Sequence, residues 1–209
     1  MQAAFGVAAV GELQPRYNIA PTQDVIVVRA VADGLQVDSL RWGLVPFWAK
    51  DPAIGNRMIN ARAETVAEKP SFRQALRRRR CVVPADGFFE WQKTADGKQP
   101  WYISAADSRL LAFAGLWEEW RDADAATLQT FTIITTVADA FMQTLHHRMP
   151  VMFDRAGVEQ WLNPAAAPAD IDCLLQSATA PELRAWPVSP AVNTPLNDRP
   201  ELLEAQPSD

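Results

Sequence analysis

The amino-acid sequence predicts an α+β fold whose mostly antiparallel core is either barrel-like or made of two sheets, with helices at its periphery. The chain has 209 residues, of which 48% are hydrophobic and 22% charged, so one globular domain over residues 1–209 can bury a large core. Sixteen prolines divide the sequence into short segments, which favours strands. Strands follow strands, with helices between only some of them, unlike the strict alternation of a doubly wound parallel sheet.

The strands are predicted from alternating or β-branched runs separated by turn residues. Asp33 and Gly34 form a turn dipeptide suited to positive φ, so the runs on either side of them are expected to pair as a hairpin. A second hairpin is expected around Ala95, Asp96 and Gly97. The predicted strands cover residues 25–31, 35–42, 88–93, 100–104, 110–117 and 130–136.

Four helices are predicted, over residues 71–79, 139–145, 154–162 and 169–176. The third has the clearest start, because Asp154 is well placed as an N-cap before an apolar face that contains Val158, Trp161 and Leu162.

Membrane and secreted classes are not favoured. No uninterrupted apolar run approaches the roughly 18 residues of a membrane span, and the first residues lack the basic start and apolar stretch of a signal peptide. We therefore expect a cytoplasmic protein with no membrane partner.

Charge is distributed unevenly along the chain. The net charge is −5, yet residues 41–80 hold ten basic and three acidic residues, whereas residues 107–209 hold six basic and fifteen acidic ones. A basic block beside aromatic residues can follow a phosphate backbone while the aromatic rings stack on bases, and it can equally be a solvated helix face. Charge alone leaves both interpretations open.

The cysteines and histidines do not predict a metal site. Cys81 and Cys173 are too few and too far apart for a disulfide framework or a thiolate zinc cage, and both are expected to be buried thiols. His146 and His147 have no further ligand at metal-binding spacing, so no metal or cofactor is expected. On an extended segment they would point to opposite sides, and at most one would reach a given site.

Aromatic residues beside glycine and proline mark a first candidate binding segment, residues 41–48. Trp48 is expected to be exposed, because Lys50 and Asp51 follow it, whereas Trp42 and Phe47 fit the core and an exposed loop equally well. Exposed aromatic rings near arginines suit the stacking of bases.

Two polar patterns could carry chemistry. Asn60, Arg62 and Glu64 place an amide, a guanidinium and a carboxylate close together, either to hold a phosphate-containing ligand or as a salt bridge that caps a turn. Glu90 stands between Phe89 and Trp91 on a predicted strand. It lies either on a solvent face or in an apolar pocket, where its pKa would rise and it could carry protons near neutral pH.

Taken together and in order, these segments resemble a known family. The motifs are RYNIAPTQ, RWGLVPFWA, INARAET, RRCVVPADGFFEWQK with PWYIS, LHHRMPVMF and PVSPAVNTPLND, which span about residues 5–205. They are similar to those of the SRAP family, the SOS-response-associated peptidase domain of bacteria and of the eukaryotic abasic-site processing proteins. Collinear motifs over nearly the whole chain are far more specific than any one of them.

The resemblance implies a single SRAP domain, a monomer, that accepts single-stranded DNA containing abasic sites and associates with the nucleoid during DNA damage. It also implies a covalent reaction, in which a cysteine at position two forms a thiazolidine cross-link with the aldehyde of the ring-opened sugar. The α-amine of that cysteine, with a pKa of about 7.7–8.0, forms the Schiff base before the thiol closes the ring.

Residue roles are carried over by motif. Asn60 is expected to hold the N-terminal residue, Glu90 to move protons at the amine and imine, and His146 to act as acid or base on the sugar and the linkage. These roles need Glu90 and His146 to lie close together. The residues expected to contact DNA are Asn18, Pro21, Trp48, Arg62 and Arg148.

The sequence departs from the family pattern at position two, which is Gln2. Family members usually begin Met-Cys-Gly-Arg, so this chain is expected to start inside the first helix, with about twenty residues absent and the cysteine with them. Two alternatives remain open: a peptidase that uses the same N-terminal nucleophile, and a non-catalytic module that binds single-stranded DNA.

Overall fold

A computed structural model describes residues 5–7, 11–95 and 97–206. Its strands are β1 (Asp24–Val31), β2 (Gly34–Trp42), β3 (Asn60–Arg62), β4 (Arg80–Ala85), β5 (Gly87–Thr94), β6 (Gly97–Ala105), β7 (Leu111–Arg121), β8 (Thr127–Val137), β9 (Arg148–Pro150) and β10 (Leu183–Pro187). The helices are α2 (Arg73–Arg78), α3 (Arg155–Leu162) and α4 (Pro168–Ser177), with 3-10 turns η1 (Pro52–Arg57), η2 (Met142–Thr144), η3 (Pro190–Asn193) and η4 (Pro200–Leu203).

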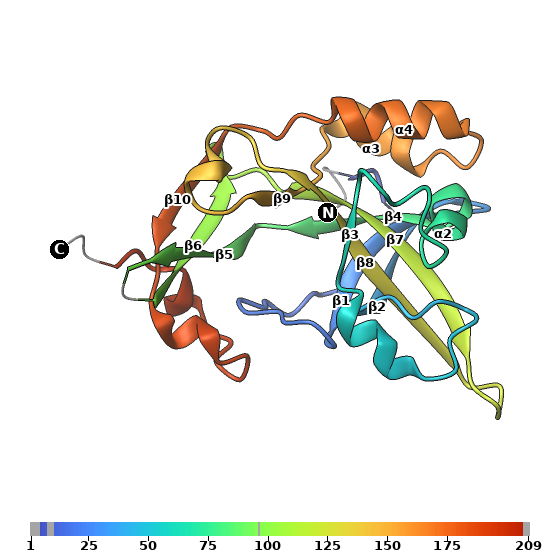
Figure 1. Cartoon of the computed structure of the whole chain (residues 1–209), viewed down its shortest axis with the longest axis horizontal. Coiled ribbons are helices and arrows are strands. Elements are labelled where there is room, and N and C mark those ends of the chain that lie inside the picture. The colour runs from blue at the N-terminus through green and yellow to red at the C-terminus, as the bar shows by residue number, and fades with distance from the viewer. Residues whose placement is uncertain (1–4, 8–10, 96, 207–209) are drawn as a thin grey trace.

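The strands form a large sheet and a small one, which Figure 1 shows side by side. The large sheet runs β2-β1-β4-β7-β8-β3, with β9 also paired to β8. An additional parallel pairing between β2 and β8 closes β2, β1, β4, β7 and β8 into a ring of five strands. The small sheet runs β10-β6-β5 and is antiparallel throughout. The core thus contains both a barrel and a second sheet, and the predicted α+β class is confirmed.

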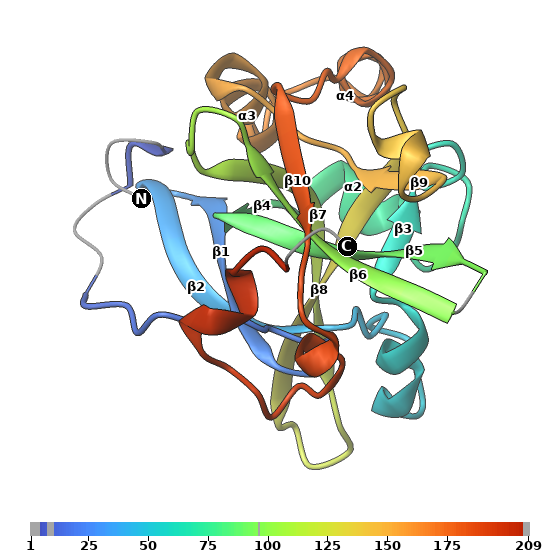
Figure 2. The same ribbon diagram turned by 90° about the vertical axis from the view of Figure 1, so that its left-hand side faces the viewer.

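Each face of the large sheet buries its own cluster of apolar side chains. On one face, Val28 belongs to a cluster with Val158 of α3 and Ile171 of α4. On the other face, Phe113 belongs to a cluster with Ile103 of the small sheet. Figure 2 views the molecule from the side of the small sheet, with β6 in front of β7 and β8. The small sheet therefore covers the face of the large sheet that the helices leave open.

Both predicted hairpins form, each with a glycine that takes up the positive φ of its turn. Val31 pairs with Gly34, whose φ is 125°, and Thr94 pairs with Gly97, whose φ is 138°. Asp96, which belongs to the second predicted turn, lies outside the described residues. Asp154 caps α3 as predicted, since its carboxylate accepts from the Gly157 amide at 2.8 Å.

The helix predicted over residues 139–145 is wrong. Only the 3-10 turn η2 forms there, although Asp139 does cap it by accepting from the Met142 amide at 2.8 Å. The reason is the short connection between two paired strands. Val137 of β8 pairs with Arg148 of β9, so residues 138–147 must bring the chain back antiparallel to β8.

No helix among the described residues is both long and apolar enough to span a membrane.

Candidate active site

Glu90 lies on the face of β5 that is turned toward the large sheet. Side chains alternate along a strand, so Phe88, Glu90 and Gln92 share one face and Phe89 and Trp91 share the other. Phe88 packs in the cluster between the sheets, whereas Phe89 and Trp91 pack in a separate cluster on the outer side of the small sheet. Glu90 therefore lies on the inner face of the small sheet and not on its outer face.

Glu90 meets His146, as the resemblance requires. Their side chains lie 3.5 Å apart, measured from Glu90 Oε2 to His146 Nδ1, and are 23% and 32% exposed. The other oxygen, Glu90 Oε1, accepts from the Trp91 amide at 3.0 Å. The pair is thus partly shielded from water and still reachable from outside.

Nδ1 of His146 faces Glu90 and the main chain of Arg148. It has two acceptors within reach, Glu90 Oε2 at 3.5 Å and the carbonyl oxygen of Arg148 at 3.1 Å, and one donor, the Arg148 amide at 3.2 Å. A proton on Nδ1 satisfies the acceptors and an unprotonated Nδ1 accepts from the amide, so both tautomers have a partner here. Nε2 has no hydrogen-bond partner among the described residues, which leaves it available to a bound molecule.

Gln92 holds the loop of His146 against β5. Its amide nitrogen donates to the carbonyl oxygen of Thr144 at 2.8 Å, and its amide oxygen accepts from the indole of Trp101 at 3.1 Å. The sequence analysis missed this residue. The signal was present, because a residue two positions after Glu90 on a strand shares its face.

Asn60 and Arg62 face the same side of the large sheet as the small sheet does. They pair with Ile133 and Thr135 of β8, and directly paired residues point to the same side. Ile133 belongs to the cluster between the two sheets. Both Asn60 and Arg62 are exposed, so their polar groups are available to a ligand.

Arg148 is held by Glu64. The two guanidinium nitrogens of Arg148 donate to the two carboxylate oxygens at 2.7 and 2.9 Å, and one of them also donates to the carbonyl oxygen of Thr135 at 2.6 Å. The hydrogen bond from Arg148 holds the pKa of Glu64 below its ordinary value. A salt bridge does form in this region, but Glu64 makes it with Arg148 of β9 and leaves Arg62 exposed.

Two aromatic side chains project from the loop after β2. Phe47 is 52% exposed and Trp48 is 48% exposed, whereas Trp42 stacks on Phe131 with ring centroids 6.3 Å apart. Trp48 lines an open cavity of about 300 Å³ together with Lys50 and Arg57. The tryptophan ring can stack on a base, and the lysine ammonium and arginine guanidinium beside it can bind the phosphate of the same nucleotide.

Asn18 is buried, and its side chain links two distant segments of the chain by hydrogen bonds. It is 6% exposed, and its amide nitrogen donates to the carbonyl oxygens of Val192, Thr194 and Asn197. Pro21 is partly buried in the turn before β1. The bonds of Asn18 connect the segment before β1 to the segment after β10, so its amide hydrogens already have acceptors.

The histidine rings do not point to opposite sides. Their centroids lie 4.3 Å apart with 50° between the planes. The expectation fails because it assumed an extended chain, whereas residues 146 and 147 form the bend between η2 and β9.

Neither cysteine lies at the Glu90–His146 pair. Cys81 is fully buried, and burial raises the pKa of its thiol far above the ordinary value. Cys173 is exposed, which corrects the expectation that both are buried: it lies on α4 between the buried Ile171 and Leu175, on the outer side of the helix. Gln2 lies outside the described residues.

Among the described residues there is no group of three or more possible metal ligands from His, Cys, Asp and Glu.

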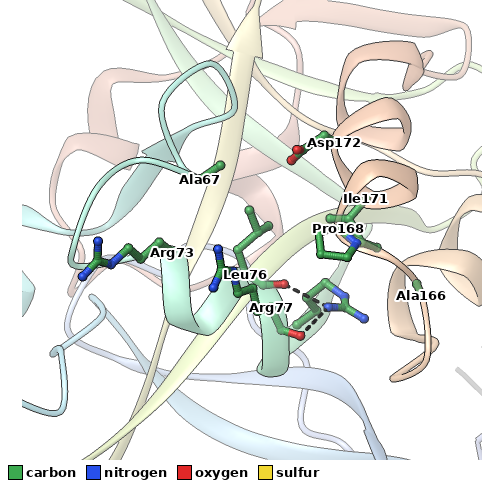
Figure 3. A pocket seen from close by; sticks show the side chains of 9 residues that line it. Ala67, Arg73, Leu76, Arg77, Ala166, Pro168, Ile171 and Asp172 are labelled. Atoms are coloured by element: carbon green, nitrogen blue, oxygen red, sulfur yellow. Dashed lines mark hydrogen bonds between the residues drawn. The ribbon is translucent and has the colours of Figure 1, made fainter.

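A second cavity, of about 90 Å³, lies between α2 and α4 (Figure 3). Arg80 lines it, but its guanidinium donates to the carbonyl oxygens of Leu76, Arg77, Trp161 and Asn163. This arginine joins the ends of two helices.

Comparisons with known proteins agree on one group. The family model described as SOS response associated peptidase (SRAP) matches residues 1–195. The chain is 45% identical over 197 residues to the abasic site processing protein YoqW of Bacillus subtilis, covering 93% of this chain and 88% of the relative. It is 31% identical over 192 residues to the abasic site processing protein YedK of Escherichia coli, covering 90% and 84%. A solved structure of a Bacteroides thetaiotaomicron protein is similar, with a TM-score of 0.78, 30% identity and coverage of 88% of this chain and 82% of that one.

Proposed function

The chain belongs to the SOS response associated peptidase (SRAP) family, and we propose that it binds single-stranded DNA and, when a cysteine directly follows its initiator methionine, processes abasic sites by covalent attachment to the ring-opened sugar. The observation that carries the proposal is the contact of Glu90 with His146 between the two sheets. Exposed Asn60 and Arg62 on the same side of the large sheet support it. Abasic-site processing is the activity that the names of the relatives state.

The reaction needs proton transfers that this pair can perform. An amine adds to the sugar aldehyde to give a carbinolamine, which loses water to become an imine. Glu90 takes a proton from the nitrogen as the amine adds and returns it to the former carbonyl oxygen, which becomes the hydroxyl group. His146, as an imidazolium with a proton on each ring nitrogen, donates its Nε2 proton to that hydroxyl group, which leaves as water, and then takes the remaining proton from the iminium nitrogen. Positioned groups of this kind contribute typically 10²- to 10⁴-fold in rate.

DNA is held by groups around the pair. Arg62 donates to a phosphate, and the amide of Asn60 orients the amine that attacks the sugar. The rings of Phe47 and Trp48 provide a stacking surface for bases next to the abasic site. Arg148 is paired with Glu64 through both terminal guanidinium nitrogens, so the pair presents little net charge to DNA and Arg62 is the proposed phosphate contact.

A stable link needs a thiol beside the amine. Addition of the thiol to the imine carbon closes a five-membered thiazolidine and removes the imine from hydrolysis. Cys81 is unsuited, because it is fully buried with a raised pKa. Cys173 is on α4, which packs on the opposite face of the large sheet. The proposed nucleophile is a cysteine directly after the initiator methionine, a position that Gln2 occupies in this sequence.

The test compares two proteins on denaturing gels. The chain that begins Met1-Gln2, incubated with an abasic single-stranded oligonucleotide, should form no heat-stable adduct, and borohydride should trap a weak imine. A longer version that begins Met-Cys-Gly-Arg should form an adduct that survives boiling, and Glu90→Ala or His146→Ala in that version should slow its formation by about 10²-fold or more. An equally stable adduct from the chain that begins Met1-Gln2 would point to another nucleophile.

Binding is tested separately from chemistry. Each phosphate neutralised on single-stranded DNA contributes about −0.7 to the slope of log affinity against log salt, so Arg62→Ala should flatten that slope by about this amount. Arg155→Ala is the matched control, because Arg155 is exposed on α3, across the large sheet from Arg62. Equal effects of the two variants would contradict the placement of DNA on the face that carries Arg62.

A further inference from the structure

Phe47 and Trp48 belong to a loop, residues 43–49, that is buried up to the point where the two rings begin. Residues 43–46 are buried, whereas both rings are about half exposed. Phenylalanine and tryptophan bury most of their surface in the majority of proteins. Here the rings stay outside because the main chain of this aromatic loop is bonded to the large sheet on either side of them.

The first of these bonds comes from Thr130 of β8. The Val45 amide donates to Thr130 Oγ1 at 2.9 Å, and the two residues are 1% and 0% exposed. Thr130 pairs with Arg41 of β2 and Glu118 of β7 through the sheet, so its hydroxyl group is the part that serves the loop. A buried amide without an acceptor is costly, and this bond therefore fixes the loop just before the rings.

The second bond comes from Trp120 of β7. Its indole Nε1 donates to the carbonyl oxygen of Ala49, the residue directly after Trp48, at 2.7 Å. The Ala49 amide donates in turn to the carbonyl oxygen of Pro46 at 2.9 Å and closes the turn that carries the rings. The sheet thus holds the loop at Val45 and at Ala49, with both rings between these points.

The start of the loop is also fixed against η1. Gly43 and Gly55 approach so closely that a Cβ on Gly43 would lie 2.6 Å from the carbonyl oxygen of Gly55, which only a glycine avoids. η1 ends at Arg57, which lines the cavity of about 300 Å³ together with Trp48 and Lys50. The ring and the two cations therefore stand on segments whose main chains are in contact.

Building on the proposed function, we propose that Thr130 and Trp120 are positioning residues for DNA, which act through the main chain of the aromatic loop and hold Phe47 and Trp48 outward before DNA binds. Bases then stack on a surface that is already formed. A loop that is ordered in the free protein loses less conformational freedom on binding, and this raises the affinity. Thr130 is fully buried, so its effect reaches DNA only through the loop.

Thr132 provides a matched control on the same strand. Side chains two positions apart on a strand share a face, and Thr132 is as fully buried as Thr130. Its hydroxyl group has no hydrogen-bond partner among the residues that the structure describes. Thr130→Val and Thr132→Val therefore remove the same group from neighbouring buried positions, and only the first leaves a loop amide without its acceptor.

The first measurement uses the protein alone and follows hydrogen exchange of the amides in residues 44–49. Thr130→Val should speed exchange of the Val45 amide by about 5-fold or more, because its hydrogen bond is lost. Thr130→Ser, which keeps the hydroxyl group, should restore slow exchange. Trp120→Phe, which keeps a ring and loses the N–H donor, should speed exchange of the Ala49 amide by a similar factor. Equal exchange in Thr130→Val and Thr132→Val would overturn the inference.

The second measurement is the affinity for an intact single-stranded oligonucleotide, at a temperature where all variants are folded. Thr130→Val should weaken binding by about 3-fold or more, since the loop then spends less time in the binding arrangement, and Thr132→Val should leave it unchanged. In a chain that carries Phe47→Ala and Trp48→Ala, Thr130→Val should have no further effect. An equal loss with and without the rings, or no loss in either chain, would overturn the positioning role.

Failure of the proposed function gives a different result. If removing both rings leaves the affinity for single-stranded DNA unchanged, the stacking surface of the proposed function is wrong, and the role of Thr130 and Trp120 in DNA binding is overturned with it. If instead the rings matter and Thr130→Val changes neither exchange nor affinity, this inference alone is overturned and the stacking surface stands.

Discussion

Replacing Asn18 by alanine tests whether this residue ties the fold together or contacts DNA. The resemblance assigns Asn18 to DNA, yet its side chain is 6% exposed. Its amide nitrogen donates to the carbonyl oxygens of Val192 at 3.0 Å, Thr194 at 3.3 Å and Asn197 at 3.0 Å. Alanine removes both amide hydrogens and leaves three carbonyl oxygens with one partner fewer.

The size of the effect follows from these bonds. Two amide hydrogens contribute a net of about 1 kcal/mol each, and buried carbonyl oxygens left without a donor add to the loss, so Asn18→Ala should cost about 2–3 kcal/mol of the free energy of unfolding. Asn18→Asp should cost more. It places a carboxylate opposite the same carbonyl oxygens and close to Asp198, whose Oδ1 already accepts from the main-chain N–H of Asn18 at 3.1 Å.

The assay is urea unfolding followed by tryptophan fluorescence, for which the chain has eight tryptophans. With a slope of about 2 kcal/mol per molar urea, the midpoint for Asn18→Ala should fall by about 1–1.5 M. Asn56→Ala is the control. Asn56 is exposed, and surface substitutions usually change stability by less than about 0.5 kcal/mol.

The reasoning is refuted by a specific pair of results. If Asn18→Ala unfolds at the same urea concentration as the original chain and binds single-stranded DNA more weakly, Asn18 is a DNA contact and its internal bonds contribute little. A lower midpoint with unchanged affinity for DNA, measured where both proteins are folded, supports the internal role.

Two further predictions concern ionisable groups. The hydrogen bond from Arg148 lowers the pKa of Glu64 in the folded protein, so this pair stabilises the fold fully above the unfolded value of about 4.3 and less as the pH falls through the lower folded value. Glu64→Gln should therefore reduce the fall in melting temperature on acidification, and parallel melting curves for the two proteins would contradict this. In a thiol-alkylation experiment read by mass spectrometry, the exposed Cys173 should react in the folded protein and Cys81 only after unfolding, because burial removes access and raises its pKa. Labelling of both at one rate would show that Cys81 is accessible.

The sequence predicted the hairpins well because their information is local. Alternation and a glycine at the turn determine each pair, and both hairpins form with Gly34 and Gly97 at positive φ. The three-residue strands β3 and β9 were not predicted. Three residues are too few to show the alternation of apolar and polar side chains that marks a strand. These strands form because β8 provides main-chain hydrogen-bond partners for both of them. The helix over 139–145 failed for the same reason: the pairing of β8 with β9 overrides the local preference.

The sequence named candidate site residues but not their geometry. The pattern around Glu90 left open a solvent face, which is the usual case, and an apolar pocket, and it is the large sheet packed against β5 that places Glu90 on an inner face. For the two adjacent histidines, the expected arrangement of the rings was wrong. A rule for extended chains placed the rings apart, and a bend that only the tertiary structure defines brought them together.

The separation of Glu90 and His146 depends on how the two sheets are held together. Glu90 belongs to the small sheet, whereas His146 precedes a strand of the large one. Two contacts set their separation: the amide of Gln92 bonded to Thr144, and the apolar packing of Phe88 against Phe113 with ring centroids 5.7 Å apart. Neither contact involves a reacting group. Since a small displacement of one sheet would move Glu90 and His146 apart, the core between the sheets performs two tasks: it stabilises the fold, and it sets the separation on which the proposed proton transfers depend.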